Sequence, residues 1–139
     1  MVAVGPSADV VEMFARRLPM SVICELLGVH YDDRGEFAGW VSDATSAEVS
    51  QEKRAEGLSK QAAYVAGMVA QRRHHPADDL LGRLVLARDE DDRLSGDELI
   101  FLGVGLLGAG FETTASRIAN FVYLLLTHPD QFALLCACR

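Results

Sequence analysis

SGDELIFLGVGLLGAGFETTASRIANFVYLLLT, residues 95–127, is the stretch that decides the fold, and it predicts one long helix. Ser95 and Glu98 have the spacing of a capping box, a pattern that marks the beginning of a helix. Pro129 ends the helix and is suited to the first turn of the next one. At 1.5 Å per residue, about thirty residues span roughly 45 Å, which is long for a small globular domain. The apolar composition predicts that nearly every side of this helix is buried.

Four glycines stand in the interior of this predicted helix, at positions 103, 105, 108 and 110. Each costs about 1 kcal/mol of helix stability relative to alanine. A helix that accepts this loss needs a physical reason, which is the close approach of another backbone or of a large flat group. A phosphate-binding loop is a poor alternative, because no lysine follows the glycines and no strand precedes them.

An acid and two hydroxyls follow the glycines, namely Glu112, Thr113 and Thr114. Burying a carboxylate is unfavourable unless it is paired or protonated. The helical spacing permits direct contact of Glu112 with Ser116 and of Thr113 with Arg117. Taken alone, the triplet is typical of the exposed face of an amphipathic helix. The glycines and the apolar neighbours favour a chemical site instead, because little of this helix is suited to water.

The rest of the chain predicts further helices and no strand, so the expected fold class is all-α with about six helices. Gly28 is a natural stop for an apolar helical pattern that has a junction or kink at Pro19. The first half of the chain predicts a helix after Ser7, its continuation through 22–27, a helix from Tyr31 towards Val41, and a polar stretch over 42–50 that is a loop or a frayed helix end. The expected segments after it are a helix over 51–73 with an apolar stripe at Leu58, Ala62, Val65, Met68 and Val69, a short helix after Asp79, and a charged turn over 88–93.

Composition limits the classes of function. The chain has 139 residues, with 13 basic and 20 acidic side chains and a formal net charge of −7, which disfavours nucleic acid as a partner. Cys24, Cys136 and Cys138 form no disulfide framework and fit a reducing cytoplasm. We expect no signal peptide and no metal site made by this chain alone. The longest uncharged run, residues 99–111, is too short to span a bilayer.

Residues 109–114, AGFETT, resemble the Ala-Gly-x-Glu-Thr-Thr signature in the long central helix of bacterial cytochrome P450 monooxygenases. The flanking sequence agrees in the correct order, with DLLGRLVLARD at 79–89, LSGDEL at 94–99, HPDQ at 128–131 and LPMSVICELLGV at 18–29. The resemblance covers the chain from Ala8 to Leu135. It implies that the chain is the central helical portion of the mostly helical cytochrome P450 fold.

The resemblance assigns roles to residues of the long helix. It implies that Ala109 and Gly110 lie over the face of the haem, where small side chains leave space for dioxygen and substrate. Thr113 also borders the cofactor and is the distal alcohol, with Glu112 as its acid partner. Together these two residues supply protons for cleavage of the O–O bond, which is general acid chemistry in a dry pocket.

The implied enzyme is a cytoplasmic, haem-dependent monooxygenase. It oxidises a small apolar substrate with dioxygen and with electrons from a ferredoxin-type redox partner. Leu106 and Leu107, one turn before the signature, are the expected substrate-facing residues. The alternative is a non-enzymatic all-α module that binds a small ligand or regulates another protein, which an apolar helical interior also permits. An acid–alcohol pair within a glycine-rich helix favours the enzyme.

Two elements of the family do not occur in this sequence: the Phe-x-x-Gly-x-x-x-Cys loop with the haem-ligand cysteine, and the Glu-x-x-Arg pair of a later helix. We therefore expect residues 1–139 to be a partial cytochrome P450 domain, without a complete independent domain, that is inactive alone and holds no haem as a thiolate complex. An apolar share of 50% fits a segment buried in a larger fold. The isolated chain is expected to be marginally stable, molten or aggregation-prone.

Overall fold

The computed structural model describes residues 7–91 and 94–137, and within these ranges it contains helices and no strand. The predicted all-α class is confirmed. A π-helix, η2 (Val11–Ala15), leads into α1 (Arg17–Leu27), and a 3₁₀ turn, η3 (Tyr31–Asp33), leads into α2 (Arg34–Thr45). The other helices are α3 (Gln51–His74), α4 (Leu80–Asp91), α5 (Gly96–Thr127) and α6 (Pro129–Ala137).

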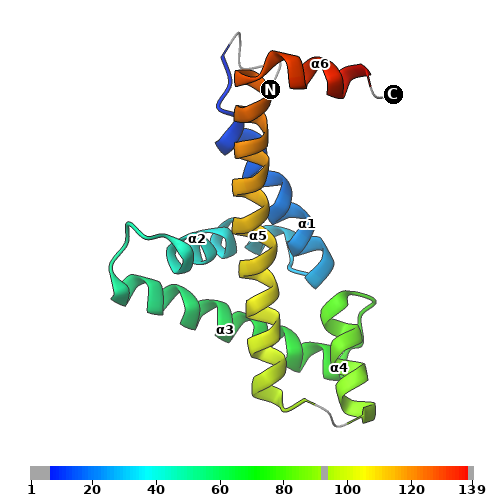
Figure 1. The fold of residues 1–139 in the computed structure, drawn as a ribbon. Coiled ribbons are helices and arrows are strands. Elements are labelled where there is room, and N and C mark those ends of the chain that lie inside the picture. Colours follow the sequence, from blue (N-terminus) through cyan, green and yellow to red (C-terminus); the bar gives the residue numbers. More distant parts are fainter. Residues whose placement is uncertain (1–6, 92–93, 138–139) are drawn as a thin grey trace.

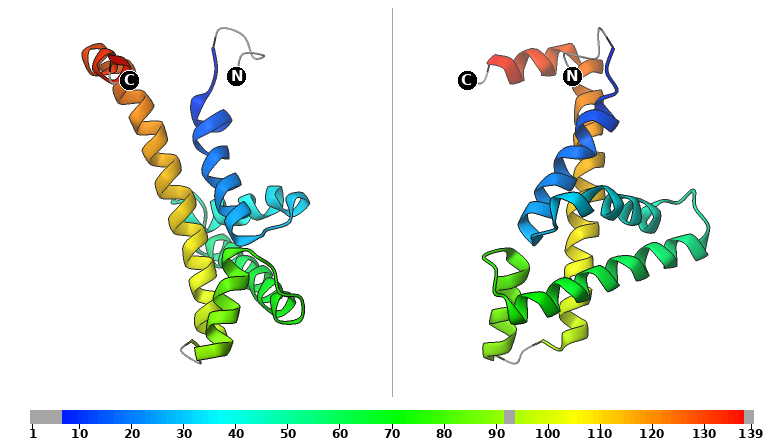
Figure 2. Two further views of the ribbon diagram at one scale, coloured as in Figure 1. Left: turned by 90° about the vertical axis from the view of Figure 1, so that its right-hand side faces the viewer. Right: turned by 180° about the vertical axis from the view of Figure 1, so that it is seen from behind.

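The long helix α5 is the axis of the molecule, and α1, α2, α3, α4 and α6 all contact it (Figure 1). It has 32 residues and the bounds that the sequence predicts. The N-terminal segment and α1 run beside its middle and C-terminal half, whereas α3 crosses its N-terminal half (Figure 2). The last helix, α6, begins at the C-terminal end of α5 and runs away from the axis of α5 (Figure 1).

The predicted capping box starts α5. The backbone N–H of Glu98 donates to Ser95 Oγ at 3.2 Å, and the Ser95 N–H donates to Glu98 Oε2 at 2.7 Å. The hydrogen bonds from Ser95, the backbone one first, favour the ionised carboxylate and lower the pKa of Glu98. The helix thus begins where two of its free amide groups are satisfied.

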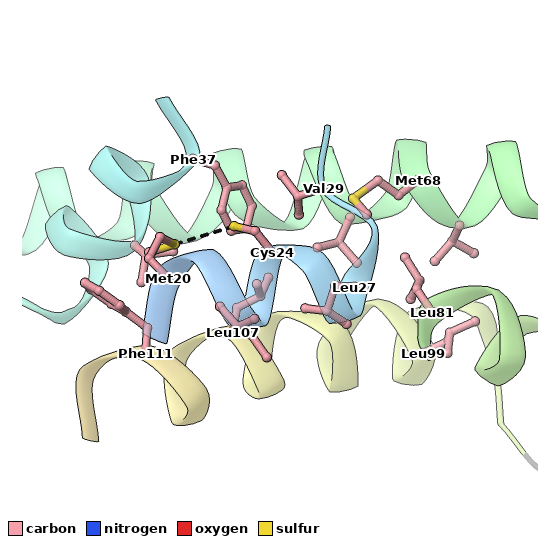
Figure 3. Close-up of a cluster of buried hydrophobic side chains, with 14 of the residues drawn as sticks. Met20, Cys24, Leu27, Val29, Phe37, Met68, Leu81, Leu99, Leu107 and Phe111 are labelled. Carbon is pink, nitrogen blue, oxygen red and sulfur yellow. Dashed lines mark hydrogen bonds between the residues drawn. The ribbon is translucent and has the colours of Figure 1, made fainter. Parts of the chain in front are cut away.

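One side of α5 is a buried seam in which every fourth residue faces the core: Leu99, Gly103, Leu107, Phe111 and Ala115. Residues four apart lie on the same face of a helix, so this seam fixes the rotation of α5 about its own axis. The facing side chains come from several helices and include Met20, Cys24, Leu27, Phe37, Met68 and Leu81 (Figure 3). The hydrophobic core therefore lies between α5 and the first four helices.

A buried ion pair ties the α3–α4 connection to the end of α1. Arg72 Nη2 lies 2.7 Å from Asp79 Oδ2, and the two side chains are 8% and 14% exposed. The same nitrogen donates to the Gly28 carbonyl oxygen at 2.9 Å. Gly28 ends α1 as predicted, with φ of +72°, and a Cβ there would overlap the Asp79 carboxylate. Glycine is therefore required both by the backbone angle and by the ion pair.

The structure decides one predicted boundary and corrects another. The helix α2 continues to Thr45, whose hydroxyl donates to the Val41 carbonyl oxygen at 2.8 Å, so residues 42–45 are the end of a helix and the loop covers only 46–50. The helix α4 continues to Asp91, where the sequence predicted a charged turn from residue 88. Residues 92–93 of that predicted turn lie outside the described residues. In both cases a polar stretch of sequence continues a helix, and a composition argument takes such a stretch for a loop.

The apolar stripe predicted for α3 is partly wrong. Leu58 is 48% exposed, whereas Val65, Met68 and Val69 are buried as expected. The reason is the close approach of α2, which buries Gly57 and Gln61 of α3 instead. Gln61 Nε2 donates to the Trp40 carbonyl oxygen at 3.1 Å, so the side of α3 that faces α2 carries Gly57 and Gln61 rather than Leu58.

Large apolar side chains remain exposed on the C-terminal half of α5 and on α6. Those at least half exposed are Phe121, Tyr123, Leu124, Leu126, Leu134 and Leu135. By length and composition α5 also qualifies as a membrane-crossing helix, with 28% of its most apolar window buried, although the core helix of a soluble protein meets the same criterion. Apolar patches of this kind are rare on soluble monomers, so this surface requires a covering layer.

Two glycines of α3 allow a matched test of the α2–α3 contact. A Cβ at Gly57 would lie 2.8 Å from the Trp40 carbonyl oxygen, whereas a Cβ at Gly67 meets nothing within 4 Å. We expect Gly67→Ala to raise the free energy of unfolding by about 1 kcal/mol through helix propensity. Gly57→Ala should lower it, because backbone must shift to admit the methyl group. Equilibrium urea unfolding measures both, and stabilisation by both substitutions would contradict this packing.

Tyr64 gives a test in alkaline solution. Its hydroxyl donates to Asp33 Oδ2 at 2.6 Å. Burial, reinforced by this hydrogen bond, raises the pKa of Tyr64 to about 12. Because the folded-state pKa lies above the ordinary value of about 10, the stability from this group is intact below that value and is lost as the pH rises through the folded-state pKa. We expect Tyr64→Phe to remove the component near pH 12 from the tyrosinate absorbance titration; its persistence would contradict the assignment.

Candidate active site on the central helix

Thr113 lies near the middle of α5 with an exposed side chain. Its hydroxyl donates a 2.5 Å hydrogen bond to the Ala109 carbonyl oxygen, one turn earlier. The bond occupies the hydroxyl hydrogen and leaves the oxygen able to accept a further hydrogen bond. The Thr113 hydroxyl is therefore held by the helix backbone. It is not held by Arg117, the partner that the helical spacing permitted.

Glu112 is half-buried, and its carboxylate is only partly satisfied. Oε2 is buried and has no hydrogen-bond partner within the part of the chain that the structure describes. Glu112 and Ser116 line the same cavity of about 190 Å³, together with Arg16 and Asn120. The sequence permitted a direct contact between Glu112 and Ser116, and in the structure both residues line this one cavity. The carboxylate thus has one enclosed oxygen and lies beside a small cavity.

The residues Gly105, Ala109 and Thr113 form an exposed face on α5, spaced four apart. This face points away from the buried seam. Its side chains are small, so a large partner can approach the helix closely along one turn on either side of Ala109. The sequence prediction that another backbone or a large flat group approaches this helix closely is consistent with that surface.

The four interior glycines divide into two pairs. A Cβ at Gly103 would lie 2.8 Å from Val65 Cγ1, and a Cβ at Gly110 would lie 3.1 Å from Ile23 Cδ1. Contacts with α3 and α1 therefore explain these two positions. A Cβ at Gly105 or Gly108 meets nothing within 4 Å. Their cost of about 1 kcal/mol each has no explanation in the packing of the described residues, which supports close approach from outside them.

The structure separates the two leucines expected to face substrate. Leu107 is 1% exposed and lies in the buried seam, where it contacts the core (Figure 3). Leu106 is half-buried and packs at the edge of the core cluster. The burial of Leu107 follows from its place one helical turn from Gly103 and Phe111. Leu106 is therefore the better placed of the two for contact with a ligand.

Sequence reasoning missed Arg16. The Arg16 guanidinium Cζ lies 5.4 Å from the centroid of the Phe111 ring. Phe111 is the residue directly before Glu112 in the chain. Arg16 also lines the cavity that contains Glu112. The sequence carries no local signal for this approach, because nearly a hundred residues separate Arg16 from the signature. The tertiary contact between η2 and α5 brings the two together.

The cytochrome P450 family model matches residues 28–135. The chain belongs to the cytochrome P450 family. The central helix, the acid–alcohol pair and the exposed small-residue face described above therefore lie in a fold that the family shares. This confirms the resemblance on which the site residues were assigned.

Named relatives are similar over nearly all of this chain. It is 49% identical over 131 residues to the mycinamicin IV hydroxylase/epoxidase of Micromonospora griseorubida, covering 94% of this chain and 33% of that protein. It is 46% identical over 128 residues to the 6-deoxyerythronolide B hydroxylase of Saccharopolyspora erythraea, covering 91% and 32%. The chain thus spans about a third of the length of the curated relatives it matches.

A solved structure agrees with the sequence comparison. The LnmA cytochrome P450 hydroxylase from the leinamycin biosynthetic pathway of Streptomyces atroolivaceus superposes with a TM-score of 0.91 at 48% identity. The match covers 97% of this chain and 35% of that chain. The helices described here therefore have the arrangement that they adopt within a longer cytochrome P450.

The residues present fit a haem, the cofactor of the family. Haem is large and flat, and the exposed face of Gly105, Ala109 and Thr113 offers a surface that side chains do not obstruct. An added methyl group at Gly105 would project into that open space. The donor set of this face holds one hydroxyl and no metal ligand, so it suits contact with a macrocycle rather than coordination of iron.

The cysteines allow a direct test of cofactor binding by this chain alone. Cys24 is fully buried in the core, where its thiol donates to Met20 Sδ at 3.6 Å, and burial raises the pKa of that thiol. Cys136 is exposed on α6, and Cys138 lies outside the described residues. None follows the glycine loop of a haem-ligand cysteine.

We expect the purified 139-residue chain to show no thiolate Soret band after addition of haem, reduction and exposure to carbon monoxide. The physical reason is that Cys24 is buried in the core and that no cysteine of the sequence follows the glycine loop of a haem-ligand cysteine. Absorption spectroscopy measures this, with a complete cytochrome P450 as the positive control. A thiolate Soret band from the chain alone would contradict the prediction.

Proposed function

We propose that the chain is part of a haem-dependent monooxygenase that activates dioxygen and oxidises a small apolar substrate. The observation that carries the proposal is the pair of consecutive residues Glu112 and Thr113, one with a buried carboxylate oxygen and one with a fixed, exposed hydroxyl. On this proposal residues 1–139 form part of one cytochrome P450 domain, and α5 is its oxygen-activating helix. No observation favours a non-enzymatic ligand-binding module, in which this pair has no role.

Haem, when bound, supplies the activation of dioxygen and the oxidising chemistry. The proposed cofactor-contacting residues of this chain are Ala109, Gly110 and Thr113. Ala109 keeps the face clear of side chains, and Gly110 allows α1 to pack closely behind it. Thr113 would hold a proton donor at the open face by accepting its hydrogen bond at the hydroxyl oxygen. Glu112 is the proposed general acid, which gives up its carboxyl proton and is left as a carboxylate.

The proposed substrate is small and apolar, with Leu106 as a substrate-facing residue and Leu107 as its support in the core. The names of the relatives, two hydroxylases among them, support hydroxylation or epoxidation as the reaction. The electrons come, on this proposal, from a ferredoxin-type partner in the cytoplasm. The net charge of −7 supports a function without nucleic acid, and the contacts of α5 with five helices support a core helix rather than a membrane span.

The complete protein that contains this chain allows the function to be tested at Thr113. Thr113→Val keeps the shape of the side chain and removes the hydroxyl. We expect product formation to fall by about 10²-fold or more, because proton delivery is lost, and the consumed reductant to appear as hydrogen peroxide. Product and peroxide are measured per molecule of reduced nicotinamide cofactor oxidised.

Two control variants define the outcome. Thr113→Ser restores the hydroxyl and should recover most of the product yield. Thr114→Val changes the neighbouring threonine, which lines a groove with Leu18 and Val22 of α1, and should leave the ratio of peroxide to product near that of the wild type. Wild-type yield in Thr113→Val would overturn the role given to this residue.

A further inference from the structure

A cavity of about 690 Å³ lies between α3, the end of α1 and the connection from α3 to α4. Its volume falls in the range of about 300–1,000 Å³ that is typical of small-molecule sites. Six of the lining residues are polar: His30, Asp33, Tyr64, Gln71, Arg72 and His75. None of the lining residues belongs to α5, so the cavity shares no residue with the open face of Gly105, Ala109 and Thr113.

Gly67 forms part of the wall of this cavity, in the interior of α3. It is exposed, and a Cβ there meets nothing within 4 Å, whereas a Cβ at Gly57 of the same helix would meet the backbone of α2. A glycine inside a helix costs about 1 kcal/mol relative to alanine. At Gly67 no contact among the described residues requires this loss. The missing side chain instead keeps the cavity open, as at positions where a ligand approaches the backbone closely.

Asp33 gives one end of the cavity a negative charge. Its Oδ2 accepts the hydrogen bond of the Tyr64 hydroxyl at 2.6 Å, and Oδ1 keeps its lone pairs for a ligand. The positive charge of Arg72, which also lines the cavity, is neutralised by the ion pair with Asp79. With neutral histidines the cavity is therefore negative overall, and this charge attracts a cation to the end formed by Asp33.

The other end of the cavity offers hydrogen-bond donors. Arg72 follows Tyr64 by two helical turns of α3, which places it about 12 Å further along the helix at 1.5 Å per residue. Arg72 Nη1 donates to Gln71 Oε1 at 3.4 Å, so the NH₂ group of Gln71 remains as a donor. The imidazole of His75 adds a ring N–H on the same side of the cavity. These groups are suited to a hydrogen-bond acceptor such as a carboxylate.

Both ends of the cavity are held in place without a ligand. The Tyr64 hydroxyl fixes the carboxylate of Asp33. Arg72 is held by Asp79, at 2.7 Å, and by the Gly28 carbonyl oxygen, at 2.9 Å. A ligand that bridges the two ends therefore has little side-chain order to impose, which favours binding.

We propose that this cavity binds an elongated organic cation, an amine or guanidinium compound with a hydrogen-bond acceptor at its far end. The charged end meets Asp33, the body lies over Gly67, and the acceptor receives hydrogen bonds from Gln71 and His75. The proposal goes beyond the proposed function and does not rest on it, because the cavity contains no residue of the central helix.

Three related probes test the polarity of the cavity in the complete protein. They are 6-guanidinohexanoate, which has both ends, hexylguanidine, which has the cation alone, and hexanoate, which has the acceptor alone. A guanidinium stays protonated and so has no lone pair for a haem iron. Isothermal titration calorimetry measures the dissociation constants. We expect 6-guanidinohexanoate to bind several-fold more tightly than hexylguanidine and about tenfold or more tightly than hexanoate. Equal affinity for all three probes would overturn the proposal.

A matched pair of glycine variants locates the bound probe. Gly67 and Gly39 are both exposed in helices, and a Cβ at either position meets nothing within 4 Å, but only Gly67 lines the cavity. Gly67→Leu should weaken the binding of 6-guanidinohexanoate about tenfold or more, because its side chain fills the cavity. Gly39→Leu should leave the affinity unchanged, and thermal unfolding without probe checks that both variants are folded. Undiminished binding in folded Gly67→Leu would place the probe elsewhere and refute the site.

Substitutions at the two ends test each contact separately. Asp33→Asn removes the charge, keeps an oxygen for the Tyr64 hydroxyl, and should weaken both guanidinium probes about tenfold. Asp32→Asn changes the exposed neighbouring acid and should weaken them less than about twofold. Gln71→Ala should abolish the advantage of 6-guanidinohexanoate over hexylguanidine and leave the affinity for hexylguanidine unchanged. Equal losses in Asp33→Asn and Asp32→Asn would show a diffuse attraction to an acidic protein in place of a specific site, and the proposal would fail.

Discussion

The rest of the structure depends on the buried seam of α5. Leu99, Gly103, Leu107, Phe111 and Ala115 are spaced by four, and this spacing allows one face of a long helix to be covered by α1, α2, α3 and α4 together. The rotation of α5 is then fixed, since turning it would expose these residues to water. The opposite face, which carries Gly105, Ala109 and Thr113, is left open by the same constraint.

The rotation of α5 also decides why Thr113 is exposed while Glu112 is half-buried. Consecutive residues of a helix point about 100° apart, so Thr113 falls on the open face while Glu112 turns toward the N-terminal segment. The alcohol is therefore exposed and fixed by the Ala109 carbonyl, whereas the acid has one oxygen enclosed beside a cleft. The two side chains therefore lie on different sides of one helix.

Outside the seam, the chain is held by a few specific polar contacts and carries much apolar surface. The Arg72–Asp79 pair joins α1 to the α3–α4 connection, and Gln61 joins α3 to α2. The exposed side chains of the C-terminal half of α5 and of α6 are of the kind that other protein usually covers. This agrees with a chain that spans about a third of the length of the relatives it matches.

The sequence by itself determined the helices and the chemical signature. The signals that end and begin these helices are local: a glycine at a helix end, a capping box and apolar periodicity. They predicted the bounds of α5 and the end of α1 at Gly28 correctly. The signature that contains Glu112 and Thr113 is local as well. Local rules failed where a neighbouring helix decided, as for Leu58 and Leu107. Only the tertiary structure separated packing glycines from open ones and brought Arg16 to the Phe111 ring, beside the cavity that Glu112 lines. Those outcomes depend on contacts between residues far apart in the chain, and no periodicity within one helix encodes them.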